Sequence, residues 1–168
     1  NQDAVPILIG GLAKLEYRGY DSSGVAVMQG EKIAVRRSVG KLVNLQNSLK
    51  ANELKGTVGI GHTRWATHGK PSEQNAHPHR SKGCVLVHNG IIENYQQLKQ
   101  QLEKDGYKFV SETDTEVVAH LIDKYLQKGK LLADAVRLAT KDVSGSYALA
   151  VMSEREPGTL IAARSGCP

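Results

Sequence analysis

The sequence predicts an α/β domain built in layers, with helices packed on β-sheets. Apolar residues recur at helical spacing in about five segments, which indicates five helices. Short apolar runs that are typical of strands occur about seven times in the 168 residues. Hairpin patterns stand at both ends of the chain, whereas helices separate the strands in the middle. No G-x-G-x-x-G or P-loop pattern is present, so a doubly wound nucleotide-binding fold is not favoured.

The N-terminal part is expected to form a helix, a β-hairpin and a second helix. Pro6 suits the first turn of a helix, and apolar residues at helical spacing continue from there to about Tyr17. Strands are predicted at Val25–Met28 and Ile33–Arg37, joined by a tight turn. Leucines at helical spacing then mark a helix over Leu42–Leu49.

The C-terminal half is expected to contain three helices and three strands. Thr113 followed by Glu116 has the spacing of a capping box, in which the Glu side chain bonds the backbone N–H of the capping residue. The predicted elements are a helix from Glu93–Asn94 that ends at Gly106, a strand over Lys108–Ser111, a helix from the capping box to Gly129, a helix through Leu132–Ala139, and strands over Tyr147–Met152 and Thr159–Ala163.

The stretch Thr57–Asn94 is predicted to be the functional centre. It contains two apolar strand-like runs, Thr57–Ile60 and Cys84–Val87, and each is followed by a polar cluster, His-Thr-Arg or His-Asn-Gly. Two buried strands would therefore deliver polar groups to one rim. The connection between them is rich in Gly, Pro, Asn, His and Ser, and loops of this length inside a compact domain are usually functional or disordered.

Composition favours one globular domain over residues 1–168, with cytoplasmic localisation and no membrane segment. Hydrophobic residues make up 40% of the chain, and no long uncharged apolar run is present. The net charge of +5 is scattered and accompanied by no recognisable nucleic-acid motif, so nucleic acid is not an expected partner. Two cysteines without metal-ligand spacing favour reduced thiols.

Arg64 and its neighbours are candidates for substrate binding. The guanidinium can hold a carboxylate through two hydrogen bonds, and Arg64 stands just past a predicted buried strand, beside Thr67 and His68. A surface ion pair is the alternative role for Arg64. Trp65 could be a core residue, but its polar neighbours at the start of a long loop also fit a movable lid.

Asn89, Gly90 and Asp114 are the other candidates. Asn-Gly after an apolar run is a common hairpin turn, yet an Asn amide and an unobstructed backbone N–H can also stabilise an oxyanion. Asp114 is favoured in the first turn of a helix whatever the function. If Asp114 faced Arg64 across a pocket, the two charges would suit an α-amino acid.

Metal and cysteine chemistry are weaker alternatives. Histidines 62, 68, 77 and 79 are close in sequence, but no Cys or carboxylate joins them at ligand spacing, so no metal is predicted. Cys84 lies in an apolar strand and Cys167 stands at the end of the chain. Neither has a base beside it in sequence, so neither is expected to be a nucleophile.

Five motifs occur in a fixed order that identifies a family. They are EYRGYDSSG (Glu16–Gly24), HTRWATHG (His62–Gly69), NAHPH (Asn75–His79), VHNGIIEN (Val87–Asn94) and SETDTEV (Ser111–Val117). With them, nearly the whole chain resembles the glutaminase domain, a class II glutamine amidotransferase, of the glutamine–fructose-6-phosphate aminotransferases, in its bacterial form. Other class II amidotransferases, including the purine type, share the fold but not the wording of the first two motifs.

The resemblance implies an N-terminal nucleophile hydrolase fold, a four-layer αββα sandwich of two mainly antiparallel sheets between helices. It implies hydrolysis of the glutamine side-chain amide, without a cofactor, and passage of ammonia to a separate sugar isomerase domain that uses fructose 6-phosphate and usually forms the homodimer. The residue roles that it implies are an oxyanion hole at Asn89 and Gly90, glutamine binding by Arg64, Thr67, His68 and Asp114, and a closing loop that carries Trp65.

The chain departs from the family pattern at its start. The family nucleophile is an N-terminal cysteine in a short Cys-Gly-Ile-Val-Gly strand, whereas residue 1 here is Asn1. The expectation is a monomeric fragment trimmed at both ends, lacking this strand and the family's last strands, and without activity as it stands. A glutamine-binding module without chemistry is the alternative from another class.

Overall fold

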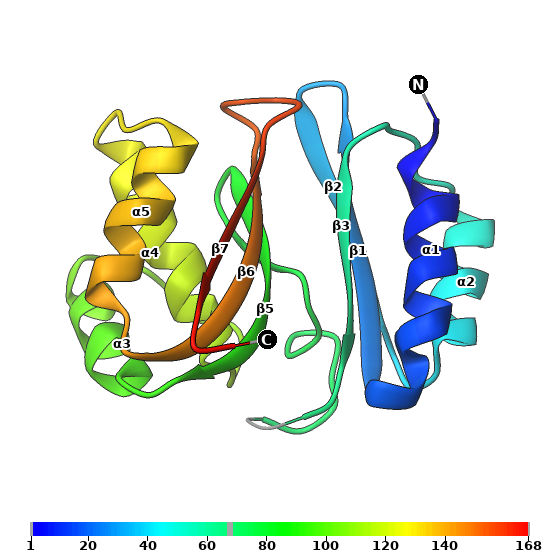
Figure 1. Ribbon diagram of the computed structural model, residues 1–168, viewed down its shortest axis with the longest axis horizontal. Helices are drawn as coiled ribbons and strands as arrows, with labels where there is room; N and C mark the ends of the chain where they lie inside the picture. The colour runs from blue at the N-terminus through cyan, green and yellow to red at the C-terminus, as the bar shows by residue number, and fades with distance from the viewer. Residues whose placement is uncertain (1, 67–68, 168) are drawn as a thin grey trace.

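The computed structural model describes residues 2–66 and 69–167 and arranges them in four layers. Helices, two sheets and further helices follow one another across the molecule (Figure 1). The elements are α1 (Ala4–Leu15), a 3-10 turn (Glu16–Arg18), β1 (Ser22–Gln29), β2 (Lys32–Val39), α2 (Leu42–Ala51), β3 (Gly59–Arg64), β4 (His79–Ser81), β5 (Cys84–Ile92), α3 (Tyr95–Lys104), α4 (Thr115–Gln127), α5 (Leu132–Asp142), β6 (Gly145–Ser153) and β7 (Leu160–Ser165).

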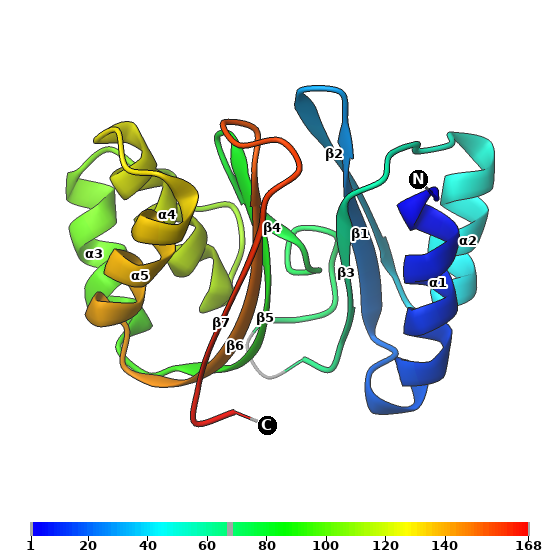
Figure 2. The same cartoon turned by 45° about the horizontal axis from the view of Figure 1, so that its top comes forward.

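Both sheets consist of antiparallel strands. The first has the order β2-β1-β3 and the second the order β4-β5-β6-β7. The predicted hairpins are confirmed as β1–β2 and β6–β7. Helices α1 and α2 cover the outer face of the first sheet, and α3, α4 and α5 cover the outer face of the second, as both views show (Figures 1 and 2).

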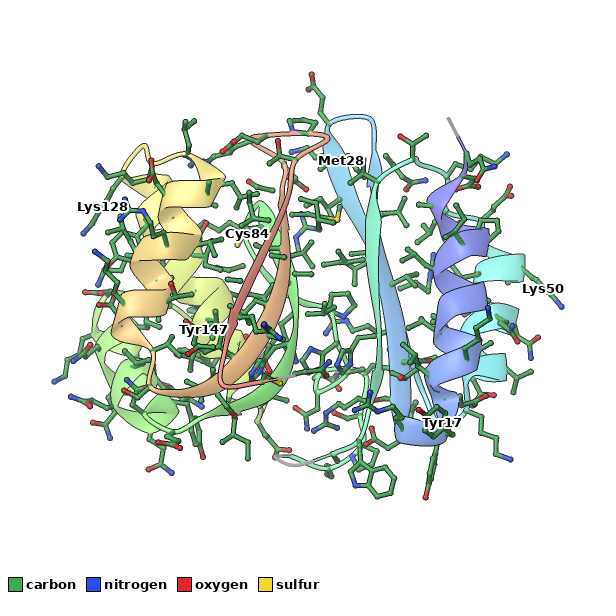
Figure 3. The ribbon with its side chains drawn as sticks, in the orientation of Figure 1. Tyr17, Met28, Lys50, Cys84, Lys128 and Tyr147 are labelled. Carbon is green, nitrogen blue, oxygen red and sulfur yellow. The ribbon has the colours of Figure 1, made fainter. Side chains whose placement is uncertain are left out.

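Three apolar clusters hold the layers together. One joins the second sheet to α3–α5, and another joins the first sheet to α1 and α2. The third lies between the sheets, where Met28 is placed, whereas Cys84 lies on the helical side of the second sheet (Figure 3). The cluster between the sheets consists of Ala26, Met28, Ile33, Ile60, Val85 and Met152.

Strand alternation places polar side chains at the other end of the space between the sheets. Successive side chains of a strand point to opposite faces, so His62 and Arg64 share the inward face of Ile60. On β5, Asn89 shares the face of Val85 by the same rule. Two strands that begin in the apolar cluster therefore end among polar groups.

The elements predicted from sequence are largely present, with three differences. Lys108–Ser111 is not a strand, because the N–H groups of Val110 and Ser111 bond the Glu116 carboxylate instead of a neighbouring strand. The short strand β4 was not predicted. The polar clusters belong to β3 and β5 themselves rather than following them, since both strands continue to Arg64 and Ile92.

Candidate active site

A cavity of about 500 Å³ adjoins β3 and β5. Side chains from α1, the two strands, the start of α4 and the C-terminal segment line it. Five residues predicted to act in the site lie around it: Arg64, Trp65, Asn89, Gly90 and Asp114. The other two, Thr67 and His68, lie outside the described residues.

Arg64 is the last residue of β3, and its side chain is buried. Its guanidinium lies 3.4 Å from the Asp21 carboxylate and donates to the Gly69 carbonyl at 3.1 Å. Asp21 also accepts the N–H of Ala66, so one carboxylate contacts both Arg64 and the chain that follows it. The alternative of a surface ion pair is wrong, because the Arg64 side chain is buried and lines the cavity, and its partner Asp21 is only 17% exposed.

Trp65 is not a core residue. Its side chain is 62% exposed and meets the Tyr20 ring edge-on, with the ring centroids 5.6 Å apart. The alternative of a core tryptophan is therefore wrong. Trp65 lines both the main cavity and a smaller hollow with Tyr20, Asp21 and Ala66.

Asn89 and Gly90 lie inside β5 and do not form a hairpin turn. They pair with Ala148 and Tyr147 of β6, in the middle of the β5–β6 ladder. Asn89 is exposed, and its side chain reaches across to β3, where its Oδ1 lies 2.8 Å from Nε2 of His62. An amide is thus presented at the cavity by a regular strand rather than by a loop.

Asp114 is the N-cap residue of α4, and its carboxylate is buried. One carboxylate oxygen accepts the backbone N–H of Ile92 at 2.8 Å, which ties the start of α4 to the end of β5. A negative charge at a helix N-terminus is favoured by the helix dipole. Asp114 and Arg64 therefore bring opposite charges to one cavity, from α4 and β3 respectively.

Four histidines gather between the sheets and beside α4: His62, His77, His79 and His88. The rings of His62 and His77 lie 4.2 Å apart, and those of His77 and His79 lie 4.8 Å apart. Burial is the main cause that lowers the pKa of each, to about 4 for His62 and about 3 for His79, and the nearby Arg64 contributes for His62, His77 and His79. The rings are therefore neutral at pH 7.

Sequence reasoning did not assign His62 to the site. The signal was available, because His62 stands two residues after the buried Ile60 and two before Arg64, on one face of a strand. Within residues 2–66 and 69–167, no group of three His, Cys, Asp or Glu side chains could hold a metal ion.

The long connection between β3 and β4 is tied to the segment before α4. The Asn75 side chain donates to the Lys70 carbonyl and to the Glu112 carboxylate, both at 2.9 Å. In return, it accepts the Glu112 N–H at 2.8 Å. Farther along, His79 contacts Thr113 at 3.1 Å. The NAHPH motif thus fixes this connection next to Asp114.

The two cysteines differ in position. Cys84 is fully buried on the helical face of β5, its thiol lies 3.5 Å from the Ala119 carbonyl, and burial raises its pKa to about 12. Such a thiol is inert at neutral pH. Cys167 lines the cavity, which the sequence did not predict.

Comparisons with known proteins agree with this fold. The chain is 34% identical to the glutamine phosphoribosylpyrophosphate amidotransferase of B. subtilis, with a TM-score of 0.78 over 92% of this chain and 34% of that one. A structure described as the allosteric regulatory enzyme of purine biosynthesis gives 35% identity and a TM-score of 0.80, over 95% and 34%. These similarities confirm the predicted sandwich of the N-terminal nucleophile hydrolase type.

Curated sequences give higher identity. The chain is 54% identical to the glutamine–fructose-6-phosphate aminotransferase of Clostridium tetani, over 99% of this chain and 28% of that protein. It is 51% identical to the enzyme of the same name from Mesorhizobium japonicum, over 100% and 28%. The chain thus spans a little over a quarter of the length of these relatives.

The family comparison bears directly on the cavity. The profile described as "Glutamine amidotransferase domain" matches residues 62–167, a range that begins at His62 and contains every residue predicted to act in the site. By this match, which covers more than half of its length, the chain belongs to the glutamine amidotransferase domain family.

Proposed function

We propose that this domain hydrolyses the side-chain amide of glutamine and releases ammonia. One observation carries the proposal: Arg64, Asp114 and the Asn89–Gly90 pair line the same cavity. Arg64 would bind the α-carboxylate of glutamine and Asp114 its α-ammonium group, because opposite charges pair strongly in buried sites. Thr67 and His68 join this proposed site on the family resemblance alone.

Asn89 and Gly90 would stabilise the transition state. Attack on the amide carbon turns the carbonyl oxygen into an oxyanion, which the Asn89 side-chain amide and the Gly90 N–H would bind. Collapse of the tetrahedral intermediate breaks the C–N bond and expels ammonia, and water then releases glutamate from the acyl-enzyme. Trp65, exposed at the cavity mouth, would belong to the part that closes over bound glutamine.

The nucleophile in this proposal is an N-terminal cysteine whose own α-amino group acts as the base, as in the family that the chain resembles. Cys84 cannot take this role, because it is buried with its pKa raised to about 12. These 168 residues on their own contain the cavity but not this nucleophile. We therefore expect them to bind glutamine but not to hydrolyse it.

The ammonia acceptor in the proposal is fructose 6-phosphate, held by a separate sugar isomerase domain and converted to glucosamine 6-phosphate. The names of the Clostridium tetani and Mesorhizobium japonicum relatives support this assignment, as do the EYRGYDSSG and HTRWATHG motifs. The structural similarity to purine-type amidotransferases keeps phosphoribosylpyrophosphate as the second candidate acceptor. The two candidates are separated by joining the domain to a sugar isomerase domain or to a phosphoribosylpyrophosphate-binding domain and measuring which of the two acceptors is converted to its aminated product.

The activity is tested by giving the chain an N-terminal Cys-Gly-Ile-Val-Gly strand and measuring glutamate release from glutamine. We expect hydrolysis by the extended chain and none by the 168 residues alone. Replacing Asn89 by Ala in the extended chain should lower kcat about 10²–10³-fold, the usual cost of one oxyanion donor. Hydrolysis by the unextended chain would contradict the assigned nucleophile, and a Cys167→Ser variant would show whether Cys167 caused it.

Calorimetry separates an enzyme from a binding module. The 168 residues should bind glutamine, and Asp114→Asn should weaken binding by about 10- to 100-fold if the ammonium group pairs with this carboxylate. Binding by the extended chain without any hydrolysis would favour the module.

A further inference from the structure

His62 and Asn89 contact each other across the space between the two sheets. His62 stands on the inward face of β3 and Asn89 on the inward face of β5, and the distance between His62 Nε2 and Asn89 Oδ1 is 2.8 Å. The His62 side chain is half-buried, whereas Asn89 is exposed and lines the cavity. A half-buried ring from one sheet therefore contacts the amide that the other sheet presents.

The surroundings of the His62 ring select one tautomer. Its Nδ1 is buried and has no hydrogen-bond partner among residues 2–66 and 69–167. A proton on Nδ1 would leave a buried N–H without an acceptor, whereas a proton on Nε2 has an acceptor within reach. The second tautomer therefore has the lower free energy. The proton of the neutral ring therefore belongs on Nε2, which donates to Asn89 Oδ1.

The His62 ring stays neutral at pH 7 mainly because it is shielded from solvent. Burial is the main cause that lowers its pKa to about 4, and His88 and Arg64 lower it further, while the Asn89 bond and Asp21 oppose the shift. His77 stacks on the ring at 4.2 Å with an interplanar angle of 30°, and Nδ1 of His77 accepts the backbone N–H of His88. The His62 ring is thus held in place from its face as well as its edge.

We propose that His62 is a positioning residue that fixes the rotation of the Asn89 carboxamide. With Oδ1 held by His62, the Asn89 Nδ2 hydrogens must point away from β3, where they can serve as a preformed oxyanion donor. Without that contact, the exposed amide would rotate and could present its oxygen to the developing negative charge. This inference rests on the proposed function, since it concerns the amide that would bind the oxyanion.

Two amide substitutions test the geometry in the extended, cysteine-bearing domain. Glutamine at position 62 can place its N–H where Nε2 stands, whereas asparagine reaches only the place of Nδ1. We expect His62→Gln to keep kcat within about threefold of the wild type. His62→Asn should lower kcat at least tenfold, with KM changed less than about threefold, because the contact acts on the transition state.

Asn89→Ala is measured beside them. If Asn89→Ala loses about 10²–10³-fold in kcat while His62→Asn and His62→Gln are equally active, the inference about His62 is overturned and the proposed function stands. If Asn89→Ala is fully active, the oxyanion role itself fails. A merely structural role of His62 would lower the stability of both substituted chains without separating their kcat values.

A second measurement needs neither a variant nor activity. Nitrogen NMR of the ¹⁵N-histidine-labelled 168-residue chain at pH 7 distinguishes the two neutral tautomers of each ring. We expect His62 to carry its proton on Nε2. A proton on Nδ1 would overturn the inference, because Nε2 could then only accept and the Asn89 amide would have to point its Nδ2 toward β3.

Discussion

Gly90 shows at the scale of one residue why Asn-Gly was ambiguous in the sequence. Its backbone has φ +124°, a conformation that favours glycine in turns and strands alike. A Cβ built on Gly90 would lie 2.0 Å from the Ser146 carbonyl oxygen of the neighbouring strand. A glycine is therefore required at position 90 because β5 and β6 pack closely there. The Asn-Gly pair is common in hairpin turns for a different reason, namely the positive φ of the turn, so the dipeptide alone could not distinguish the two cases.

Replacing Gly90 by alanine should destabilise the fold strongly. The positive φ alone costs an L-residue about 1–2 kcal/mol, and the contact with Ser146 adds strand displacement to this cost. We expect a total of about 3 kcal/mol or more, measured by urea unfolding. Gly106→Ala is the matched control, because Gly106 has φ +88° but none of the described residues lies within 4 Å of its added Cβ. Equal losses in both variants would contradict the close approach.

The roles of the histidines could be predicted only in part. Their clustering in sequence is visible, but which of them meets Asn89 depends on two strands of different sheets, and no local pattern encodes that pairing. His62 contacts Asn89, whereas His79 contacts Thr113 and His88 contacts Thr115. Strand alternation could have placed His62 on the face of Arg64, but the sequence alone could not show which of the three histidines contacts Asn89.

At the scale of the element, α4 begins differently from its sequence pattern. The capping box predicted that Glu116 would bond the N–H of Thr113, but its carboxylate accepts the N–H groups of Val110 and Ser111 and the Ser111 hydroxyl, at 2.6–3.2 Å. The N-cap residue is Asp114, whose side chain is engaged with β5. Glu116 therefore orders the segment before α4, which explains why that segment is not a strand.

Glu116→Gln should weaken the fold in a pH-dependent way. Burial would raise the pKa of Glu116, but the nearby His120 ring and hydrogen bonds from Ser111 and Val110 outweigh it and hold the pKa at about 2, below the ordinary 4.5. The folded state thus binds this proton more weakly than the unfolded state, so the stabilisation is complete above pH 4.5 and is lost as the pH falls toward 2.

We expect Glu116→Gln to cost about 1–3 kcal/mol at pH 6, and the difference from the wild type to shrink below pH 4.5. Urea unfolding at pH 6, 4 and 3 measures this. Glu103→Gln, a change on the exposed face of α3, serves as the control and should alter stability little at any of these pH values. A difference for Glu116→Gln that stayed constant with pH would show that its carboxylate is not the stabilising form.

Element prediction succeeded where periodicity is strong and failed where a side chain replaces a strand partner. Helices α1 to α5 and the two hairpins follow from apolar spacing and from glycines such as Gly106 and Gly129, both with positive φ. The number of strands agrees with the prediction only because two errors cancel. The predicted strand Lys108–Ser111 does not form, and the strand β4 was not predicted. Strand β4 has three residues, too few for any alternation to be recognised.

At the scale of the whole molecule, the space between the sheets combines an apolar cluster and a polar site. Ile60 and Val85 belong to the cluster, and His62, Arg64 and Asn89 line the cavity farther along the same strands, β3 and β5. Alternation predicts which residues of one strand share a face, but it does not predict which sheet that face meets. Periodicity predicted a layered domain, the family resemblance implied four layers in the order αββα, and the structure supplies the cross-sheet contacts.

This burial of histidines should make the whole fold sensitive to mild acid. Folding lowers the pKa of His62, His77, His79 and His88 below the ordinary 6.5, so between pH 6.5 and about 4 the unfolded chain binds more protons than the folded chain. Stability therefore falls as the pH drops through this window, by about 1.4 kcal/mol per pH unit for each extra proton bound by the unfolded state.

Urea unfolding at pH 7, 6 and 5 would measure this slope. We expect the free energy of unfolding to decrease steadily, and His79→Gln to reduce the slope by about one proton, since Gln cannot titrate and His79 stays neutral in the fold to about pH 3. The contact with Thr113 can be kept by the amide, so the variant should remain folded. A stability that did not change between pH 7 and 5 would mean that these rings take up protons in the folded chain as readily as in the unfolded chain, and the neutral state of His62 beside Asn89 would then have to be abandoned as well.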